Sequence, residues 1–263
     1  QSIVKKAAAA RLGDAYGLNT LPETGALFQI QFSIMKDTAV LMLDTSGPGL
    51  YKRGYRARNM GAPLKETLAA ALVTLSRYRG KDPFCDPFCG SGTIPIEAAL
   101  IAKNRAPGLD RSFSAQRWKN MDAKLWMDAA DEAMDKEFHG TYDIWGGDID
   151  PAAVELARHN AALAGVEDCI RFEVADAGQF HRDSEYGQLV TNPPYGERLL
   201  EKKEAEALYR VFGAAMAKMP GAKPVTPERQ ARLDEAAKHP TAEDQAQAGA
   251  WGLELLENFR SGK

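Results

Sequence analysis

Residues 81–102 read KDPFCDPFCGSGTIPIEAALIA, in which a short segment around Phe84 and Cys85, a glycine-rich turn and a segment rich in Ile and Ala follow one another. This pattern predicts a strand over 81–86, a loop, and a helix from Thr93 to Ala102. A strand, a glycine loop and a helix in this order begin a doubly wound, Rossmann-like α/β sheet. Because glycines let backbone N–H groups approach a ligand, the loop is predicted to bind a cofactor through Asp86, Phe88, Cys89, Gly90, Ser91, Gly92 and Thr93.

Three further strands are predicted after this unit, over 142–148, 170–174 and 187–191, with helices from Pro151 to about 164 and over 204–219. Acidic residues follow two of these strands: Asp148 and Asp150 end the first, and Asp176 follows the second. Strand carboxyl ends line the ligand crevice of such sheets. We therefore expect all three in the cofactor site, with Asp150 on ribose hydroxyls and Asp176 on an adenine amine. An N-cap role directly before Pro151 is the alternative for Asp150.

The loop differs from the dinucleotide-binding fingerprint, since it runs GSGTIP and lacks the third glycine. The second motif, TNPPYG at 191–196, is predicted to hold a planar amine. The Asn192 side-chain oxygen and the Pro193 carbonyl can each accept one N–H, while Pro194 stiffens the turn. Tyr195 offers a ring face to a base swung out of its stack. The alternative is a rigid loop at a strand end.

Together the two motifs predict methyl transfer from S-adenosylmethionine to an exocyclic amino nitrogen, with Asn192 lying beside both ligands. An N6 amine of adenine in DNA or RNA and a glutamine amide remain open as acceptors. In-line displacement on a sulfonium needs alignment and exclusion of water more than a covalent catalyst.

Charge is unevenly distributed along the chain. Residues 1–80 carry 11 Lys and Arg against 5 Asp and Glu, although the whole chain has a net charge of −3. Within this part, basic residues alternate with Tyr51 and Tyr55, a mixture suited to phosphates and bases. We predict RNA contacts at Lys52, Arg53, Arg56 and Arg58, with a solvated linker as the alternative.

The first fifty residues predict a helix over 2–12 that Gly13 ends, then a β-hairpin over 27–34 and 39–43 that turns at Lys36-Asp37. A helix is expected over 63–78. An insertion over about 104–139 holds Trp118 and Trp126, which are expected to be packing anchors. Residues 222–263 predict helix or disorder.

Composition argues against a disulfide framework, a zinc site and a membrane-spanning segment. The three cysteines lack the spacing of a disulfide framework or a zinc site, so we expect buried, reduced thiols and no metal. No apolar run approaches the roughly 20 residues of a membrane span, so a cytoplasmic protein is expected.

The motifs resemble those of the THUMP-containing RNA guanine-N2 methyltransferases, particularly those acting on large-subunit ribosomal RNA. The resemblance lies in Asp86–Thr93, Gly147–Asp150 and Asn192–Arg198. It extends to the segment that joins the two domains of that family, which is similar to residues 50–56 and 62–67. It implies a class I methyltransferase domain over 63–221, preceded by a partial α+β THUMP-like segment over 1–50 and a basic linker over 51–62. It also implies guanine N2 of 23S-type ribosomal RNA as acceptor, Thr67 near the methionine end of the cofactor, and Arg198 toward the RNA.

The chain departs from that family's pattern after about residue 220, where no fifth strand and no antiparallel pair can be recognised. An alternative of another class is therefore a non-catalytic RNA-binding remnant of a methyltransferase.

Overall fold

The computed structural model describes residues 2–21, 24–56, 64–194 and 202–220. The chain forms two compact units, one of residues 1–48 with 113–123 and one of residues 49–112 with those from 124 onward. Each unit is described by itself. No helix within the described ranges is long and apolar enough to cross a membrane.

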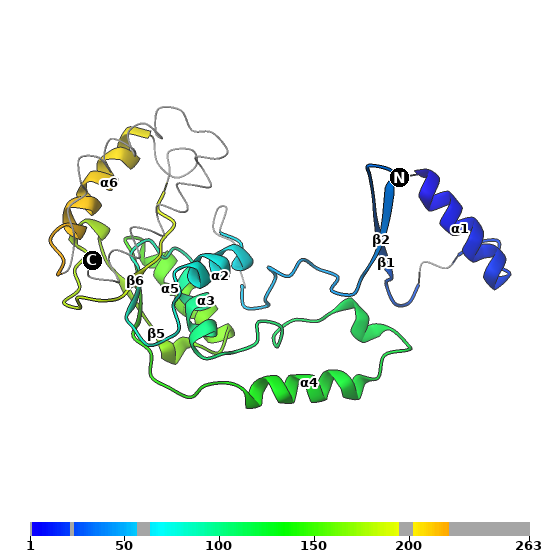
Figure 1. The fold of residues 1–263 in the computed structure, drawn as a ribbon. Helices are drawn as coiled ribbons and strands as arrows, with labels where there is room; N and C mark the ends of the chain where they lie inside the picture. Colours follow the sequence, from blue (N-terminus) through cyan, green and yellow to red (C-terminus); the bar gives the residue numbers. More distant parts are fainter. Residues whose placement is uncertain (1, 22–23, 57–63, 195–201, 221–263) are drawn as a thin grey trace. The chain divides into compact units, whose positions relative to one another are not determined.

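A four-stranded parallel sheet organises the second unit, with the order β5-β4-β3-β6. Its two edge strands, β5 and β6, are labelled in Figure 1. Its strands are β3 (Phe84–Asp86), β4 (Ile144–Asp148), β5 (Ile170–Val174) and β6 (Gln188–Leu189). Phe84 pairs with Ile144 on one side and with Gln188 on the other, which puts β3 inside the sheet. This arrangement confirms the predicted Rossmann-like α/β fold. No strand of the described residues pairs with the far edge of β6.

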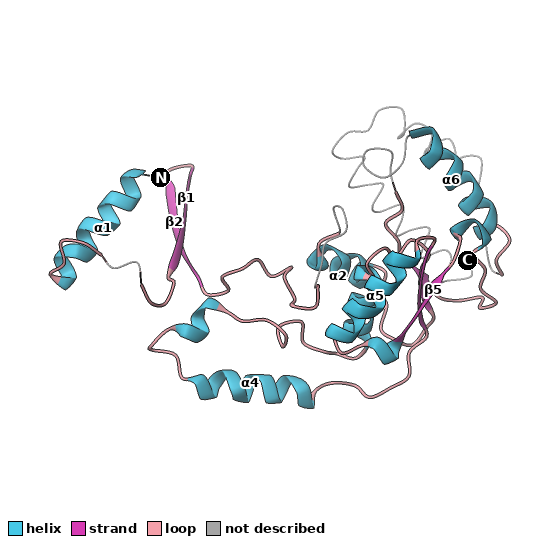
Figure 2. Ribbon diagram, turned by 180° about the vertical axis from the view of Figure 1, so that it is seen from behind, coloured by secondary structure: helices cyan, strands magenta, loops and turns pink. Residues whose placement is uncertain are grey.

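Alternate side chains of the strands enter two different apolar clusters, as the period of two requires. Phe84 and Ile144 pack with the helices of one face, whereas Cys85 and Trp145 pack with the segment around the last helix on the other face. The helices are α2 (Glu66–Leu75), α3 (Thr93–Ala102) and α5 (Pro151–Leu163) on the first face and α6 (Lys202–Met216) on the second (Figure 2).

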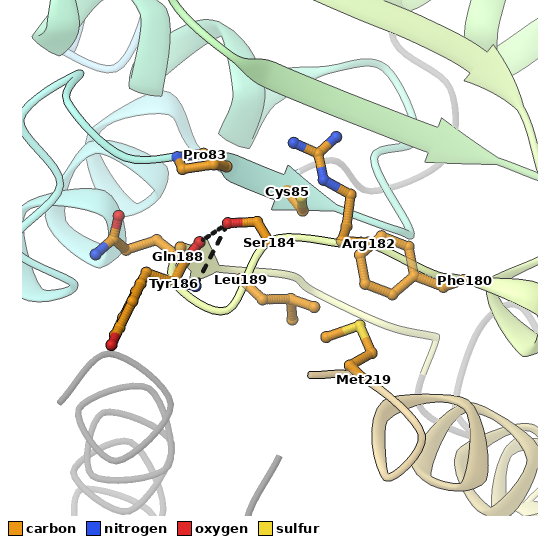
Figure 3. A pocket seen from close by; sticks show the side chains of 10 residues that line it. Pro83, Cys85, Phe180, Arg182, Ser184, Tyr186, Gln188, Leu189 and Met219 are labelled. Atoms are coloured by element: carbon orange, nitrogen blue, oxygen red, sulfur yellow. Dashed lines mark hydrogen bonds between the residues drawn. The ribbon is translucent and has the colours of Figure 1, made fainter. Parts of the chain in front are cut away.

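On the second face, the side chains of Phe180, Leu189 and Met219 surround Cys85 (Figure 3). The pocket between them holds about 20 Å³, the size of a water molecule at most. Met219 follows α6 in the chain, so this cluster attaches the carboxyl end of that helix to the sheet.

Several predicted boundaries shift. The structure has α3 and β5 at their predicted residues, but α2 is shorter than 63–78 because Arg77 has a φ of +60° and turns the chain out of the helix. The single turns η2 (Glu167–Cys169) and η3 (Ala177–Gln179) flank β5. Helix α4 (Ala123–Asp135) occupies the predicted insertion.

The first unit contains α1 (Ser2–Tyr16) and a hairpin of β1 (Gln29–Met35) and β2 (Thr38–Asp44). Lys36 and Asp37 have φ values of +48° and +57°, which fit a type I′ turn and confirm the predicted hairpin. The prediction that Gly13 ends the first helix is wrong. α1 continues past it, since a mid-helix glycine costs only about 1 kcal/mol, and Gly17 with a φ of +64° ends it.

Trp118 is a packing residue, but in the first unit rather than inside the predicted insertion. Its ring stacks on Phe28 at 4.7 Å, and its Nε1 donates a hydrogen bond to the Leu27 carbonyl at 3.0 Å. The turn η1 (Ser114–Arg117) leads into it. The middle of the predicted insertion thus belongs with the amino-terminal unit.

Candidate active site

A cleft of about 830 Å³ lies at the carboxyl ends of the four strands. This volume is in the range of small-molecule sites, at the edge where parallel α/β sheets bind ligands. The structure brings most of the predicted site residues to its walls: Asp86, Phe88, Cys89, Gly90, Ser91, Thr93, Asp148, Asp150, Asp176, Asn192 and Pro194. Their proximity agrees with the sequence argument, while their individual binding roles remain predictions.

The two glycines of the loop serve different purposes. Gly90 has a φ of +52°, and a Cβ placed there would meet no atom within 4 Å. Gly92 has a φ of +82°, but its Cβ would lie 2.9 Å from the Ala157 Cβ and 3.1 Å from the ring of Phe172. Gly90 therefore leaves room beside the cleft, whereas Gly92 allows the loop to pack on α5 and β5. This corrects the expectation that both glycines serve ligand approach.

Asp86, the last residue of β3, is buried with an exposed fraction of 1%. Its Oδ1 accepts hydrogen bonds from the Phe88 amide at 3.1 Å and from the Thr191 hydroxyl at 2.6 Å. Its Oδ2 has no hydrogen-bond partner among the described residues. Burial raises the pKa of Asp86 to about 7, although both hydrogen bonds favour the charged form and oppose the rise.

The other three acids are oriented by backbone amides. Asp148 accepts from the amides of Gly90 and Asp150, at 2.9 and 3.0 Å. Asp150 Oδ1 accepts from the Ala152 amide at 2.9 Å, so Asp150 is an N-cap of α5 and a cleft residue at once. Asp176 Oδ1 accepts from the Gly178 amide at 2.8 Å.

The loop that follows β6, here called the acceptor loop and defined as residues 191–194, forms one side of the cleft. Asn192 and Pro194 line it, and Thr191 bonds to Asp86. The Pro194 carbonyl accepts a hydrogen bond from the Tyr209 hydroxyl at 2.8 Å. Pro193 does not appear among the lining residues, and the predicted sites at Tyr195 and Arg198 lie outside the described residues.

Helix α6 supplies two wall residues that sequence reasoning missed, Glu204 and Leu208. They are four apart, so they share one face of the helix. The four-residue spacing was visible in the sequence, but nothing there indicated which face would meet the cleft.

Two arginines of the predicted basic cluster, Arg53 and Arg56, are paired with carboxylates and do not form an open phosphate-binding surface. The Arg53 guanidinium lies 3.5 Å from Glu97, which also accepts the Tyr55 hydroxyl at 3.0 Å. Arg56 lies 3.4 Å from Glu66 and donates to the Thr93 hydroxyl at 2.7 Å. These two arginines are largely buried and engaged by carboxylates, which corrects their assignment as phosphate contacts.

The remaining predicted residues lie away from the cleft walls. Lys52 is exposed, as the RNA prediction requires, and Arg58 lies outside the described residues. Thr67 is exposed in the first turn of α2 and is not among the described residues that line the cleft; Leu64 lines it instead.

Comparison with known proteins adds independent findings. Residues 53–251 match the family model described as UPF0020, RMKL-like, methyltransferase domain. The chain is 46% identical over 218 residues to a Bacillus subtilis (strain 168) protein named "Putative RNA methyltransferase YpsC", covering 82% of this chain and 57% of that one.

Two solved structures are similar along most of the chain. A "predicted N6-adenine-specific DNA methylase" from Listeria monocytogenes str. 4b F2365 is 48% identical with a TM-score of 0.78, covering 84% of this chain and 58% of that one. SMU.472, "a putative methyltransferase complexed with SAH", is 42% identical with a TM-score of 0.75, covering 82% and 58%. The chain thus spans somewhat over half the length of these relatives.

Proposed function

The chain belongs to the UPF0020 family of RMKL-like methyltransferase domains, and on that premise we propose that it methylates the N2 amine of a guanine in ribosomal RNA. The observation that carries the proposal is the shared cleft, in which the glycine loop and the acceptor loop face one ligand space at the ends of the strands. The chemistry of the acceptor loop supports an amino nitrogen as the target. Ribosomal RNA and guanine are supported by the resemblance of the motifs, and RNA also by the name of YpsC.

S-adenosylmethionine is the cofactor of this family, and the similar structure of SMU.472 contains SAH. The cleft fits it in four respects. Its volume suits a ligand of that size. Gly90 leaves open space beside the loop, and the orphaned Oδ2 of Asp86 is suited to accept the ammonium group of a methionine moiety. Asp150 and Asp176, already oriented by amides, would accept the ribose hydroxyls and the adenine amine.

When bound, the cofactor supplies a methyl group on a positively charged sulfur. Asn192 would hold the amine toward that methyl group, and the proton that the amine gives up on methylation would pass to solvent. The amine of guanine is a weak nucleophile because its lone pair is delocalised into the ring. The Asn192 side-chain oxygen, which lines the cleft, would accept one N–H of the amine, orient the nitrogen and favour the positive charge that develops on it, and the Pro193 carbonyl is the predicted acceptor of the other N–H.

Adenine N6 is the second candidate. It is favoured by the description of the similar Listeria protein as a predicted N6-adenine-specific DNA methylase. Both amines would use the same two acceptors, so the cleft chemistry does not separate them. Product analysis does, because N2-methylguanosine and N6-methyladenosine differ in mass and retention. A glutamine amide would give no methylated nucleoside.

The experiment is methyl transfer from tritiated S-adenosylmethionine to unmodified ribosomal RNA, followed by mass spectrometry of the nucleosides. We expect N2-methylguanosine from the wild-type chain. Asn192→Ala should lose at least about 100-fold in kcat, the cost of removing a transition-state acceptor, while its Kd for SAH changes less than about threefold. Asn19→Ala, at an exposed position of the first unit, is the matched control.

Two results would contradict the proposal. Full activity of Asn192→Ala would remove the role of that side chain. Absence of SAH binding by the wild-type chain in calorimetry would favour a non-catalytic remnant instead.

A further inference from the structure

The acceptor loop is hydrogen-bonded at both ends to elements that also touch the cofactor loop. At its start, the Thr191 hydroxyl donates to Asp86 Oδ1 at 2.6 Å. At its end, the Tyr209 hydroxyl donates to the Pro194 carbonyl at 2.8 Å. Asn192 and Pro193 lie between these two bonds.

The first anchor is fixed by the sheet. Asp86 is the buried end of the inner strand β3, and its Oδ1 also receives the Phe88 amide of the cofactor loop. The Val190 amide extends the pairing of β6 with β3 by donating to the Cys85 carbonyl at 3.0 Å. The backbone is therefore held up to the residue before Thr191, and the side chain of Thr191 adds one more bond to the same strand.

The second anchor is fixed by packing of α6. Phe212, three residues after Tyr209, meets the ring of Phe88 edge-on at 5.2 Å. Met219 attaches the end of the helix segment to the sheet beside Cys85 (Figure 3). Helix α6 thus links the two loops: Phe212 contacts Phe88 of the cofactor loop, and Tyr209 holds the Pro194 end of the acceptor loop.

We propose that Thr191 and Tyr209 are positioning residues, which set the distance and direction of Asn192 relative to the cofactor loop. This inference rests on the proposed function, in which Asn192 receives the amine. The two prolines already fix two φ angles of the loop. With both ends held, little freedom remains for the backbone at Asn192. A misplacement of a positioning group by about 1 Å can lower the rate about 100-fold. Holding both ends of the loop would therefore protect the rate of methyl transfer.

The kinetic test uses the whole chain with Thr191→Val and Tyr209→Phe, each of which removes one hydroxyl and keeps the shape. We expect kcat for methyl transfer to fall about 10- to 100-fold in both variants. The Kd for SAH should stay within about threefold of wild type in Tyr209→Phe, whereas Thr191→Val, which also removes a hydrogen bond from Asp86, should weaken SAH binding as well. Thr191→Ser should restore most of kcat, because it returns the hydroxyl. Thr74→Val and Tyr186→Phe are matched controls: the Thr74 hydroxyl donates to the Ala70 carbonyl within α2, Tyr186 is exposed, and neither is among the described residues that line the cleft.

A second readout does not depend on activity. Hydrogen exchange at the Val190 amide, which donates to the Cys85 carbonyl at 3.0 Å, should be at least about tenfold faster in both variants, because the loop that follows Val190 then opens more often. Unchanged exchange in both variants would overturn the bracing, as would an unchanged kcat in both when the wild type is active. If the wild type transfers no methyl group, the proposed function fails, and the exchange rates alone decide whether the braces exist.

Discussion

Asp86 is buried, lies in the wall of the cleft, and has one carboxylate oxygen without a hydrogen-bond partner among the described residues. These three properties together determine its charge state. A carboxyl group with 1% exposure is disfavoured in its charged form, because it has lost its water. The hydrogen bonds from Phe88 and Thr191 satisfy only Oδ1 and leave the pKa at about 7. A cationic ligand group beside Oδ2 would favour the carboxylate, so the free protein retains a cost that a bound cofactor can remove.

This residue predicts a pH dependence of stability. The pKa of Asp86 is about 7 in the fold and about 4 in an unfolded chain, so folding favours the protonated form. Its contribution to the free energy of unfolding is fully present below pH 4 and is lost as the pH rises to about 7, by up to roughly 4 kcal/mol. The difference in free energy of unfolding between wild type and Asp86→Asn, from urea titrations at several pH values, should fall over that window.

The control is Asp37→Asn, in the exposed hairpin turn, whose difference from wild type should show no such fall. With SAH present the window should move to lower pH, because the ammonium group stabilises the carboxylate. A flat difference between wild type and Asp86→Asn would mean that the carboxyl group is already charged in the free protein at pH 5.

At the scale of elements, the segment before α2 is attached to α3 by an ion pair and a hydrogen bond to one buried carboxylate, as well as by apolar contacts. Arg53 and Tyr55 both converge on Glu97, which has an exposed fraction of 2%. Removing one partner of such a pair leaves a buried charge uncompensated. The attachment therefore depends on all three side chains at once.

We accordingly predict that Arg53→Met lowers the free energy of unfolding by about 3 kcal/mol, whereas Lys52→Met, at an exposed neighbour, changes it by less than about 0.5 kcal/mol. Urea titration of both variants measures this. RNA binding at several salt concentrations provides the complementary readout, in which Lys52→Met should reduce the salt dependence. An Arg53→Met chain of normal stability but weakened RNA binding would restore the original sequence interpretation.

The same elements show what the sequence could and could not predict. Helix α3 and strand β5 were predictable to the residue, because Thr93 follows a glycine loop and residues 170–174 alternate apolar with charged side chains at the period of a strand. The stop of α2 at Ser76 was not, because Arg77 adopts a positive φ that no residue preference indicates. The partners of Arg53 were not predictable either, since Glu97 is 44 residues away in the chain and only the tertiary fold brings the two together.

At the scale of the whole molecule, the two units differ in how much they bury. In the second unit, α3 is almost entirely buried and its neighbours share one apolar cluster. In the first unit, no residue of α1, β1 or β2 is buried. Cross-strand pairs such as Ile30 with Leu43 and Phe32 with Leu41 form an apolar hairpin face, yet Leu41 is 72% exposed. The hairpin therefore gains little from burial, and two strands alone are marginally stable.

This contrast predicts two regimes of hydrogen exchange in one chain. Amides of α1 and the hairpin should exchange on the order of a thousandfold faster than those of α3, because they open locally while α3 exchanges through global unfolding. Mass spectrometry of peptic peptides after timed labelling separates the two regimes, with peptides from α5 as an internal reference for the buried unit. Equal protection of the hairpin and α3 would contradict the prediction. It would mean that the apolar face of Ile30, Phe32 and Leu41 is covered in solution by a surface beyond the described residues.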